Sequence, residues 1–182
     1  GLSCRRITGY RAGMTIEADI LLARRLADAA ERAAMPHFRS RLAIESKADL
    51  SPVTVADRAA EAAMRRILEA DRPGDGIYGE EYGVSAGTTD RLWVLDPIDG
   101  TRAFVAGRPI WGTLIALVEG GRPILGLIHA GAARDQWLGC TLGAPQTLLN
   151  GRPVQVRACS AFKNARVGTT HPLAFSATGH SA

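Results

Sequence analysis

The stretch WVLDPIDGTRAFV, from Trp93 to Val105, decides how the rest of this sequence is interpreted. The apolar run Leu92–Leu95 is typical of a buried strand. Pro97 cannot donate a hydrogen bond to a neighbouring strand, so we expect the sheet to stop there. The carboxylates of Asp96 and Asp99 would then lie on a turn at the end of a strand.

The residues after the second aspartate predict a short helix beginning at Gly100 and Thr101. Glycine lets the backbone bend tightly or approach a ligand closely. Amides at a helix N-terminus bind anions, and Mg²⁺ prefers carboxylate, water and phosphate oxygens. The turn therefore fits Mg²⁺-assisted phosphate chemistry. The alternative is that Asp96 and Asp99 are ordinary turn and cap residues, which aspartate also favours.

Two further acidic elements precede this turn. The stretch YGEEYG places Glu80 and Glu81 just past a short apolar run, where adjacent side chains point opposite ways. The stretch KADLSPVTVAD contains Lys47 and Asp57, and its T-x-x-D pattern is typical of a helix start. Taken singly, these are solvated acids and a capping residue. Three such elements in one chain favour a shared site.

Composition limits the class of protein. The chain has 182 residues, of which 46% are hydrophobic and 22% charged, so it can bury a core in one domain or one domain plus a fragment. Its formal net charge is +4, and three arginines lie before residue 14, so we expect no nucleic-acid partner. No apolar run reaches about 18 residues, so we expect no membrane partner.

The cysteines and the first residues give two more expectations. Three cysteines, an odd number at spacings that fit no metal site, predict free thiols in a reducing, cytoplasmic compartment: Cys4, Cys140 and Cys159. Residues 1–13 precede the first methionine and contain no apolar segment of a secretory signal. We expect them to be a non-native or disordered tail.

The order of predicted elements indicates an α+β fold. Helical spacing over residues 15–35, and again after Thr54, predicts two amphipathic helices, with residues 40–53 an irregular loop between them. Strand-like runs with short connections follow: Ile77–Glu80, Leu92–Leu95, Thr113–Glu119, Ile124–Ala130, Gln136–Cys140 and segments within 149–156 and 165–170. We expect the helices to pack on one face of a mainly antiparallel sheet.

The acidic elements, in this order, resemble the inositol monophosphatase superfamily of Mg²⁺-dependent, lithium-sensitive phosphomonoesterases. The DPIDGT block is highly specific to that superfamily, and GEE at this distance upstream agrees. The stretches RPGDGIYGEEYG and WVLDPIDGTRAFVAGRPIWGTLIAL look most like the histidinol-phosphatase branch. The resemblance spans about residues 15–170 and implies the superfamily's αβαβα layering, with Mg²⁺ as cofactor.

The resemblance also implies the ligands of the metal and of the substrate. The residues that match the family's metal ligands are Glu80, Asp96, Ile98 through its carbonyl, and Asp99. The residues that match its substrate and phosphate contacts are Asp99 together with the amides of Gly100 and Thr101.

Four residues match catalytic positions of the family: Glu80, Thr101, Asp57 and Lys47. The resemblance implies that Thr101, with Asp57 nearby, acts with Glu80 to orient a metal-activated water for attack on the phosphorus. Lys47 matches a lysine on a flexible loop ahead of the second helix, and Glu81 adjoins the metal ligand.

One family motif is missing. Family members continue past residue 182 and carry a WDxAAG-like block whose aspartate binds metal and substrate, whereas no Trp-Asp pair occurs here. The resemblance therefore divides the chain into a metal-binding domain, 14–150, and the beginning of an incomplete second domain, 151–182. A homodimer is implied by the resemblance alone.

Three hypotheses for function remain. The first is a phosphatase that hydrolyses L-histidinol phosphate to L-histidinol, a step of histidine biosynthesis. The second is a phosphatase for inositol 1-phosphate or 3′-phosphoadenosine nucleotides. The third is an inactive truncated fragment that binds metal or a partner. Either enzyme acts on a small phosphate monoester.

Overall fold

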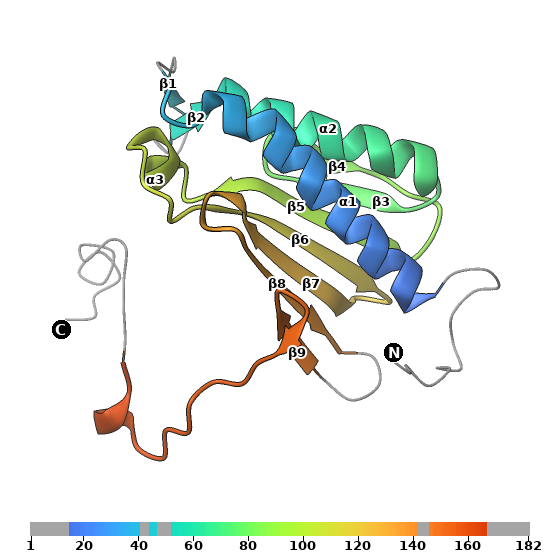
Figure 1. The fold of residues 1–182 in the computed structure, drawn as a ribbon. Coiled ribbons are helices and arrows are strands. Elements are labelled where there is room, and N and C mark those ends of the chain that lie inside the picture. Colours follow the sequence, from blue (N-terminus) through green and yellow to red (C-terminus); the bar gives the residue numbers. More distant parts are fainter. Residues whose placement is uncertain (1–14, 41–43, 47–51, 142–145, 167–182) are drawn as a thin grey trace, which may run out of the picture.

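The computed structural model describes residues 15–40, 44–46, 52–141 and 146–166 of the chain. Figure 1 shows two long helices lying side by side over one face of a twisted sheet. The helical elements are α1 (Ile16–Ala34), η1 (Met35–His37), α2 (Val55–Asp71), α3 (Thr101–Val105), η2 (Gly131–Ala133) and η3 (Phe162–Asn164). The predicted α+β class is confirmed.

The long helices form where the spacing of apolar residues predicts them. The Thr15 hydroxyl caps α1 by accepting the Ala18 amide, and Thr54 with Asp57 forms a capping box at the start of α2. Each helix buries a stripe of small and aliphatic side chains against the other helix and the sheet: Leu22, Ala23, Leu26, Ala27, Ala30, Ala60, Met64 and Leu68.

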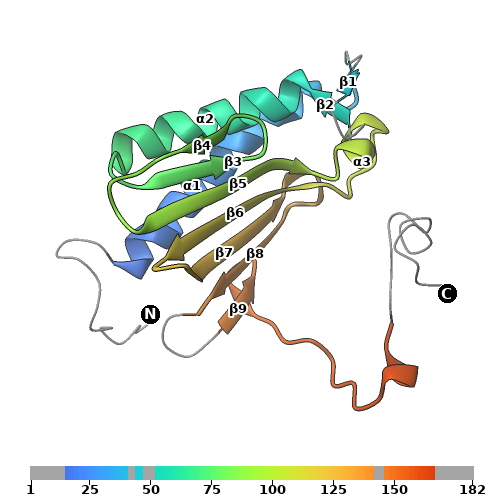
Figure 2. The ribbon, with the colours of Figure 1, turned by 180° about the vertical axis from the view of Figure 1, so that it is seen from behind.

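The main sheet has eight strands in the order β10-β9-β8-β7-β6-β5-β3-β4. Among the strands that the structure describes, only β3 and β5 pair in parallel, so the expectation of a mainly antiparallel sheet is confirmed. Seen from behind in Figure 2, the strands lie in front of α1 and α2. The bounds are β3 (Gly76–Gly79), β4 (Gly83–Ser85), β5 (Arg91–Asp99), β6 (Gly112–Glu119), β7 (Arg122–Ala130), β8 (Asp135–Cys140), β9 (Gln146–Leu149) and β10 (Arg152–Pro153).

The structure corrects the expectation that the sheet stops at Pro97. Strand β5 continues to Asp99, with its register against β6 shifted between Asp96 and Asp99. The irregularity accommodates the missing amide of proline, and the Thr113 hydroxyl donates to the Pro97 carbonyl at 2.9 Å. The carboxylates thus lie within a distorted strand end rather than beyond it.

The expectation of an irregular loop over residues 40–53 is also wrong in part. It contains β1 (Ile44–Ser46) and β2 (Pro52–Thr54), which pair antiparallel with each other. The last predicted strand, 165–170, is not a strand at residues 165 and 166, and its other residues lie outside the described part, as does the predicted tail, 1–13. None of the described helices is long and apolar enough to span a membrane.

A buried charge cluster joins α1 to the sheet. The guanidinium of Arg91 on β5 contacts the carboxylates of Asp19 at 2.7 Å, Asp75 at 3.3 Å and Glu119 at 3.1 Å. Asp75 also accepts the indole N–H of Trp93 at 3.0 Å. Because Arg91, Asp19 and Asp75 are all buried, the charges of this cluster depend on one another.

We expect Arg91→Leu to lower the free energy of unfolding by about 3–5 kcal/mol, because the buried Asp75 carboxylate loses its cation and Asp19 loses one of its cations while keeping Arg72 at 3.2 Å. Urea denaturation measures this difference. The matched control is Arg25→Leu, since Arg25 pairs with Asp71 at the surface, where such pairs contribute within about 1 kcal/mol. Equal losses in the two variants would contradict a special role for the buried cluster.

Candidate functional site

The parallel pairing of β3 with β5 brings two of the acidic elements together. Gly79, the last residue of β3, lies opposite Leu95 of β5, and the Glu80 amide donates to the Leu95 carbonyl at 3.1 Å. Glu80 therefore follows its strand at the level where Asp96 follows Leu95. Both acids therefore lie at the same end of this strand pair, the end at which β5 leads into α3.

The two aspartates at the distorted end of β5 differ in their exposure to solvent. Asp96 is half-buried and its Oδ1 is shielded from solvent, whereas Asp99 is exposed. Between them the Ile98 side chain is fully buried in the core and anchors the turn. The Thr101 hydroxyl oxygen lies 3.1 Å from the Ile98 carbonyl oxygen, which is therefore one of two possible acceptors for its single proton.

Gly100 links the strand to α3 in a left-handed conformation, with φ of 85°. A Cβ at this position would lie 3.2 Å from the Ile110 carbonyl oxygen. The Gly100 carbonyl accepts the amides of Ala103 and Phe104, so the amides of Gly100 and Thr101 lie ahead of the first hydrogen bonds within α3. The Phe104 ring is buried and packs edge-on against Trp111, which fixes this short helix to the core.

Asp57 connects the start of α2 to the same turn. Its Oδ2 accepts the amide and the hydroxyl of Thr54 at 2.9 and 2.6 Å, while its Oδ1 accepts the hydroxyl of Thr101 at 3.3 Å. Asp57 is only 2% exposed. The capping residue predicted from T-x-x-D thus also holds the threonine of DPIDGT.

Of the remaining predicted residues, Glu80 and Glu81 are described by the structure, whereas Lys47 lies outside the described residues. Glu80 is exposed, whereas its neighbour Glu81 is half-buried with its Oε1 shielded from solvent. The two adjacent acids therefore differ in surroundings.

Sequence reasoning missed Glu61 and Arg65 of α2. The Glu61 carboxylate is fully buried and accepts the amides of Glu81 and Tyr82, directly beneath the turn that carries the predicted acids. A signal was present, because Asp57, Glu61 and Arg65 recur every four residues and therefore share one face of the helix. That face is buried, although its residues are charged.

The oxygen atoms at this end of the sheet are of the chemical type that Mg²⁺ binds. Carboxylates and a backbone carbonyl are hard oxygen ligands, and Mg²⁺ keeps several waters while using one or two carboxylates and substrate phosphate. Within the described ranges, no three Asp, Glu, His or Cys side chains form a ready metal cluster. An all-protein cage is not what Mg²⁺ requires, so the donor set remains suitable.

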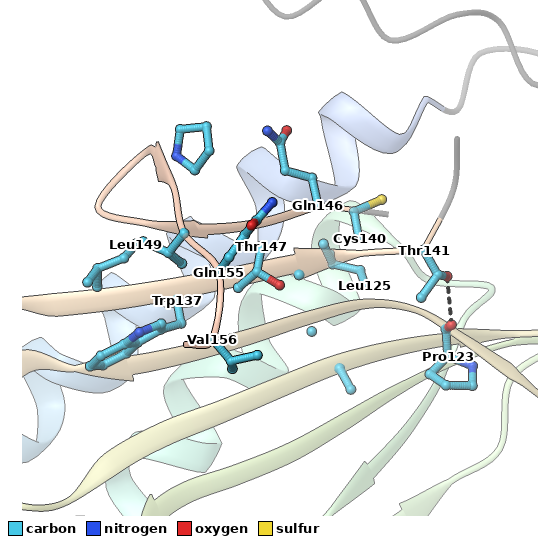
Figure 3. A pocket seen from close by; sticks show the side chains of 15 residues that line it. Pro123, Leu125, Trp137, Cys140, Thr141, Gln146, Thr147, Leu149, Gln155 and Val156 are labelled. Atoms are coloured by element: carbon cyan, nitrogen blue, oxygen red, sulfur yellow. Dashed lines mark hydrogen bonds between the residues drawn. The ribbon is translucent and has the colours of Figure 1, made fainter. Parts of the chain in front are cut away.

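A hollow with a different lining lies elsewhere on the sheet. It has a volume of about 1180 Å³ and lies over β7 to β10. Figure 3 shows the side chains that line it, with α1 and α2 behind the sheet. Its described lining is mostly apolar, including Leu125, Trp137 and Val156, and contains no acidic side chain. This hollow lacks the groups that phosphate chemistry or metal binding requires, so the acidic strand ends are the better candidate.

Comparison with protein families and curated proteins gives consistent matches. The family model described as "Inositol monophosphatase family" matches residues 16–178. The bifunctional phosphatase IMPL2 of Arabidopsis thaliana is 44% identical over 83% of this chain and 44% of its own length. The histidinol-phosphatase of Mycobacterium tuberculosis is 49% identical over 65% of this chain and 46% of its own length. The chain spans about half the length of these relatives.

Solved structures agree on the fold. An inositol monophosphatase from Zymomonas mobilis is 53% identical, with a TM-score of 0.67 over 80% of this chain and 55% of that protein. The extragenic suppressor protein suhB from Bartonella henselae is 26% identical, with a TM-score of 0.74 over 78% of this chain and 55% of that protein.

We expect Gly100→Ala to destabilise the chain more than Gly121→Ala, as measured by urea denaturation. Both glycines have positive φ, so alanine costs about 1–2 kcal/mol at either position. At Gly100 the added methyl also crowds the Ile110 carbonyl, whereas nothing lies within 4 Å of a Cβ at Gly121. Equal losses would show that backbone conformation alone requires glycine at position 100.

Proposed function

Because the chain belongs to the inositol monophosphatase family, we propose that it is a Mg²⁺-dependent phosphomonoesterase whose substrate is L-histidinol phosphate. The observation that carries this proposal is the meeting of Glu80 with the end of β5, beside a threonine hydroxyl that is held by a buried aspartate. The reaction is hydrolysis of the ester to L-histidinol and inorganic phosphate.

Four groups of this chain are proposed to hold the metal: the carboxylates of Glu80, Asp96 and Asp99, and the Ile98 carbonyl. When bound, Mg²⁺ supplies positive charge that polarises the phosphoryl oxygens and makes a water nucleophilic near neutral pH. The role of the protein is to fix these oxygens at one end of the sheet. Burial of the Ile98 side chain and the register shift in β5 serve that purpose.

Thr101 and Asp57 are proposed to orient the attacking water. A hydroxyl that donates to the Asp57 carboxylate can at the same time accept a hydrogen bond from a water. The carboxylate is itself fixed by two hydrogen bonds from Thr54, so the direction of the threonine hydroxyl is set by the start of α2. A proton leaving the water can then pass to Thr101 as its own proton passes to Asp57.

The phosphate is proposed to lie against the amides of Gly100 and Thr101, with Asp99 beside it. These amides precede the hydrogen-bonded turn of α3 and are suited to an anion. The left-handed Gly100 has no side chain to obstruct the approach. Lys47 is proposed to add a positive charge.

The choice of substrate rests on the named relatives. Histidinol-phosphatases of Mycobacterium tuberculosis and Streptomyces coelicolor are each 49% identical to this chain. The second candidate is inositol 1-phosphate, favoured by the 53% identity to the inositol monophosphatase from Zymomonas mobilis. Cytoplasmic location, lithium sensitivity and a homodimer remain predictions from the sequence and its resemblance.

We expect the chain to release phosphate from L-histidinol phosphate faster than from inositol 1-phosphate or 3′-phosphoadenosine 5′-phosphate, and only with Mg²⁺ present. Asp99→Asn should keep the fold, because the side chain is exposed, but lower the rate by more than about 100-fold. Removing a residue that only hydrogen-bonds to a metal ligand already lowers metal affinity or activity by about 10–100-fold, and Asp99 is proposed to be a ligand itself. Assays of released phosphate, with circular dichroism to verify folding, measure both effects.

Three results would change the conclusion. Faster hydrolysis of inositol 1-phosphate would overturn the substrate assignment and support the second candidate. Equal activity of Asp99→Asn would overturn the metal-ligand assignment. A folded chain that releases no phosphate from any of the compounds would support the third hypothesis, a fragment that binds metal or a partner.

We expect Thr101→Val to lower kcat by about 10²–10⁴-fold, the usual contribution of a positioned proton-transfer group. Valine has nearly the volume of threonine but lacks the hydroxyl that contacts Asp57. The control is Thr101→Ser, which keeps the hydroxyl and should retain most of the activity. Similar kcat values for the valine and serine variants would contradict the proposed role.

A further inference from the structure

We propose that Glu61 is a positioning residue whose buried carboxylate holds the turn carrying Glu80 and thereby sets the Mg²⁺ affinity. This inference rests on the proposed function, because it concerns the same metal site. The turn in question joins β3 to β4 and comprises residues 80–82. Glu61 lies beneath it on α2 and is fully buried.

The carboxylate holds the turn by its backbone. Glu61 Oε2 accepts the Glu81 amide at 2.6 Å, and Oε1 accepts the Tyr82 amide at 3.2 Å. The preceding amide, that of Glu80, donates to the Leu95 carbonyl of β5 at 3.1 Å. Three successive amides are therefore fixed, two by α2 and one by the strand that carries Asp96.

Arg65 completes this arrangement one helical turn later. Its Nε donates to Glu61 Oε1 at 2.7 Å, and its other nitrogens donate to the Gly83 carbonyl and the Ser85 hydroxyl. Its guanidinium also lies 5.9 Å from the centroid of the Tyr82 ring. The pair thus holds the turn at its amides through Glu61 and at its far end through Arg65.

The close approach of the Glu61 carboxylate to the turn depends on Gly79, which has no side chain. A Cβ at this position would lie 1.8 Å from Glu61 Oε1, so any side chain there would displace the carboxylate. Glycine at the end of β3 is therefore what lets a helix side chain reach the turn beyond the strand. An apolar residue at position 61 would fill the space but leave the amides of Glu81 and Tyr82 without their acceptor.

Through Glu61 and Asp57, helix α2 contacts both turns of the proposed site. Asp57 lies one turn earlier on the same helix face and holds Thr101 of the DPIDGT turn. Glu61 holds the GEEYG turn through its backbone amides. One rigid helix thereby fixes the spacing between the group proposed to orient water and the acid proposed to bind metal, which is the kind of support that metal ligands require.

The test variant is Glu61→Gln, with Mg²⁺ affinity measured by calorimetry. A glutamine amide must turn its NH₂ either toward the Glu81 amide or toward the Tyr82 amide and Arg65, so one donor always faces another. We expect about 10–100-fold weaker Mg²⁺ binding, as for other partners of metal ligands. Hydrogen exchange of the Glu81 and Tyr82 amides should become faster in the same variant.

The matched control is Asp75→Asn. Asp75 is also a buried carboxylate with several donors, but it lies at the opposite end of β3 and β5. This variant should lose stability without a change in Mg²⁺ affinity. Equal weakening of Mg²⁺ binding in both variants would show that Glu61 acts only through general stability, and would overturn the proposal.

Asp99→Asn separates failure of this inference from failure of the proposed function. Absent Mg²⁺ binding in the parent chain, or unchanged affinity in Asp99→Asn, would overturn the metal site itself. Weakened binding in Asp99→Asn with parental affinity in Glu61→Gln would overturn only the role of Glu61. Unchanged hydrogen exchange of the Glu81 and Tyr82 amides in Glu61→Gln would show that Glu61 does not fix the turn, whatever the change in Mg²⁺ affinity.

A milder variant, Arg65→Lys, covers the case in which Glu61→Gln does not fold. Lysine keeps the positive charge beside Glu61 but lacks the fork that reaches the Gly83 carbonyl and the Ser85 hydroxyl. We expect weaker Mg²⁺ binding, in the same direction and by a smaller factor. Parental affinity and parental amide exchange in this variant would contradict the proposal.

Discussion

The parallel pairing of β3 with β5 is the contact on which the proposed site depends. All other pairs in the main sheet are antiparallel, and an antiparallel neighbour would place the end of one strand beside the start of the next. Parallel strands end at the same edge, so Glu80 and Asp96 come together although 15 residues of hairpin and strand separate them. The residues between them form β4 and the return to β5.

Helix α2 provides the second constraint, because it crosses beneath both acidic turns. Its buried face carries Asp57 and Glu61, and each accepts hydrogen bonds from a turn at the end of a strand. Buried carboxylates cost free energy of desolvation unless their oxygens are satisfied by good donors. Here the donors are backbone amides and threonine hydroxyls, so the cost of burial is offset by fixing the geometry of the turns.

Much of this arrangement could be predicted from the sequence, since helices and strands follow from the period of apolar residues. The DPIDGT and GEE motifs identified the acidic turns, and T-x-x-D identified the start of α2. The continuation of β5 beyond Pro97 could not be predicted, because it depends on the pairing of Asp99 with Gly112 on a neighbouring strand. Glu61 was missed for a related reason: a glutamate between alanines looks solvent-exposed until a glycine on another element lets it reach the turn.

The two buried charge clusters lie at opposite ends of β3 and β5 and have different consequences. In the cluster around Arg91, side chains contact side chains, so the charges join α1 to the sheet and contribute to holding the layers together. In the pair of Glu61 and Arg65, most contacts go to the backbone of a turn. Side-chain contacts between elements fix where those elements lie, whereas contacts to backbone amides fix the path of a loop. The first cluster therefore determines whether the fold persists, and the second determines how accurately the fold presents its acidic residues.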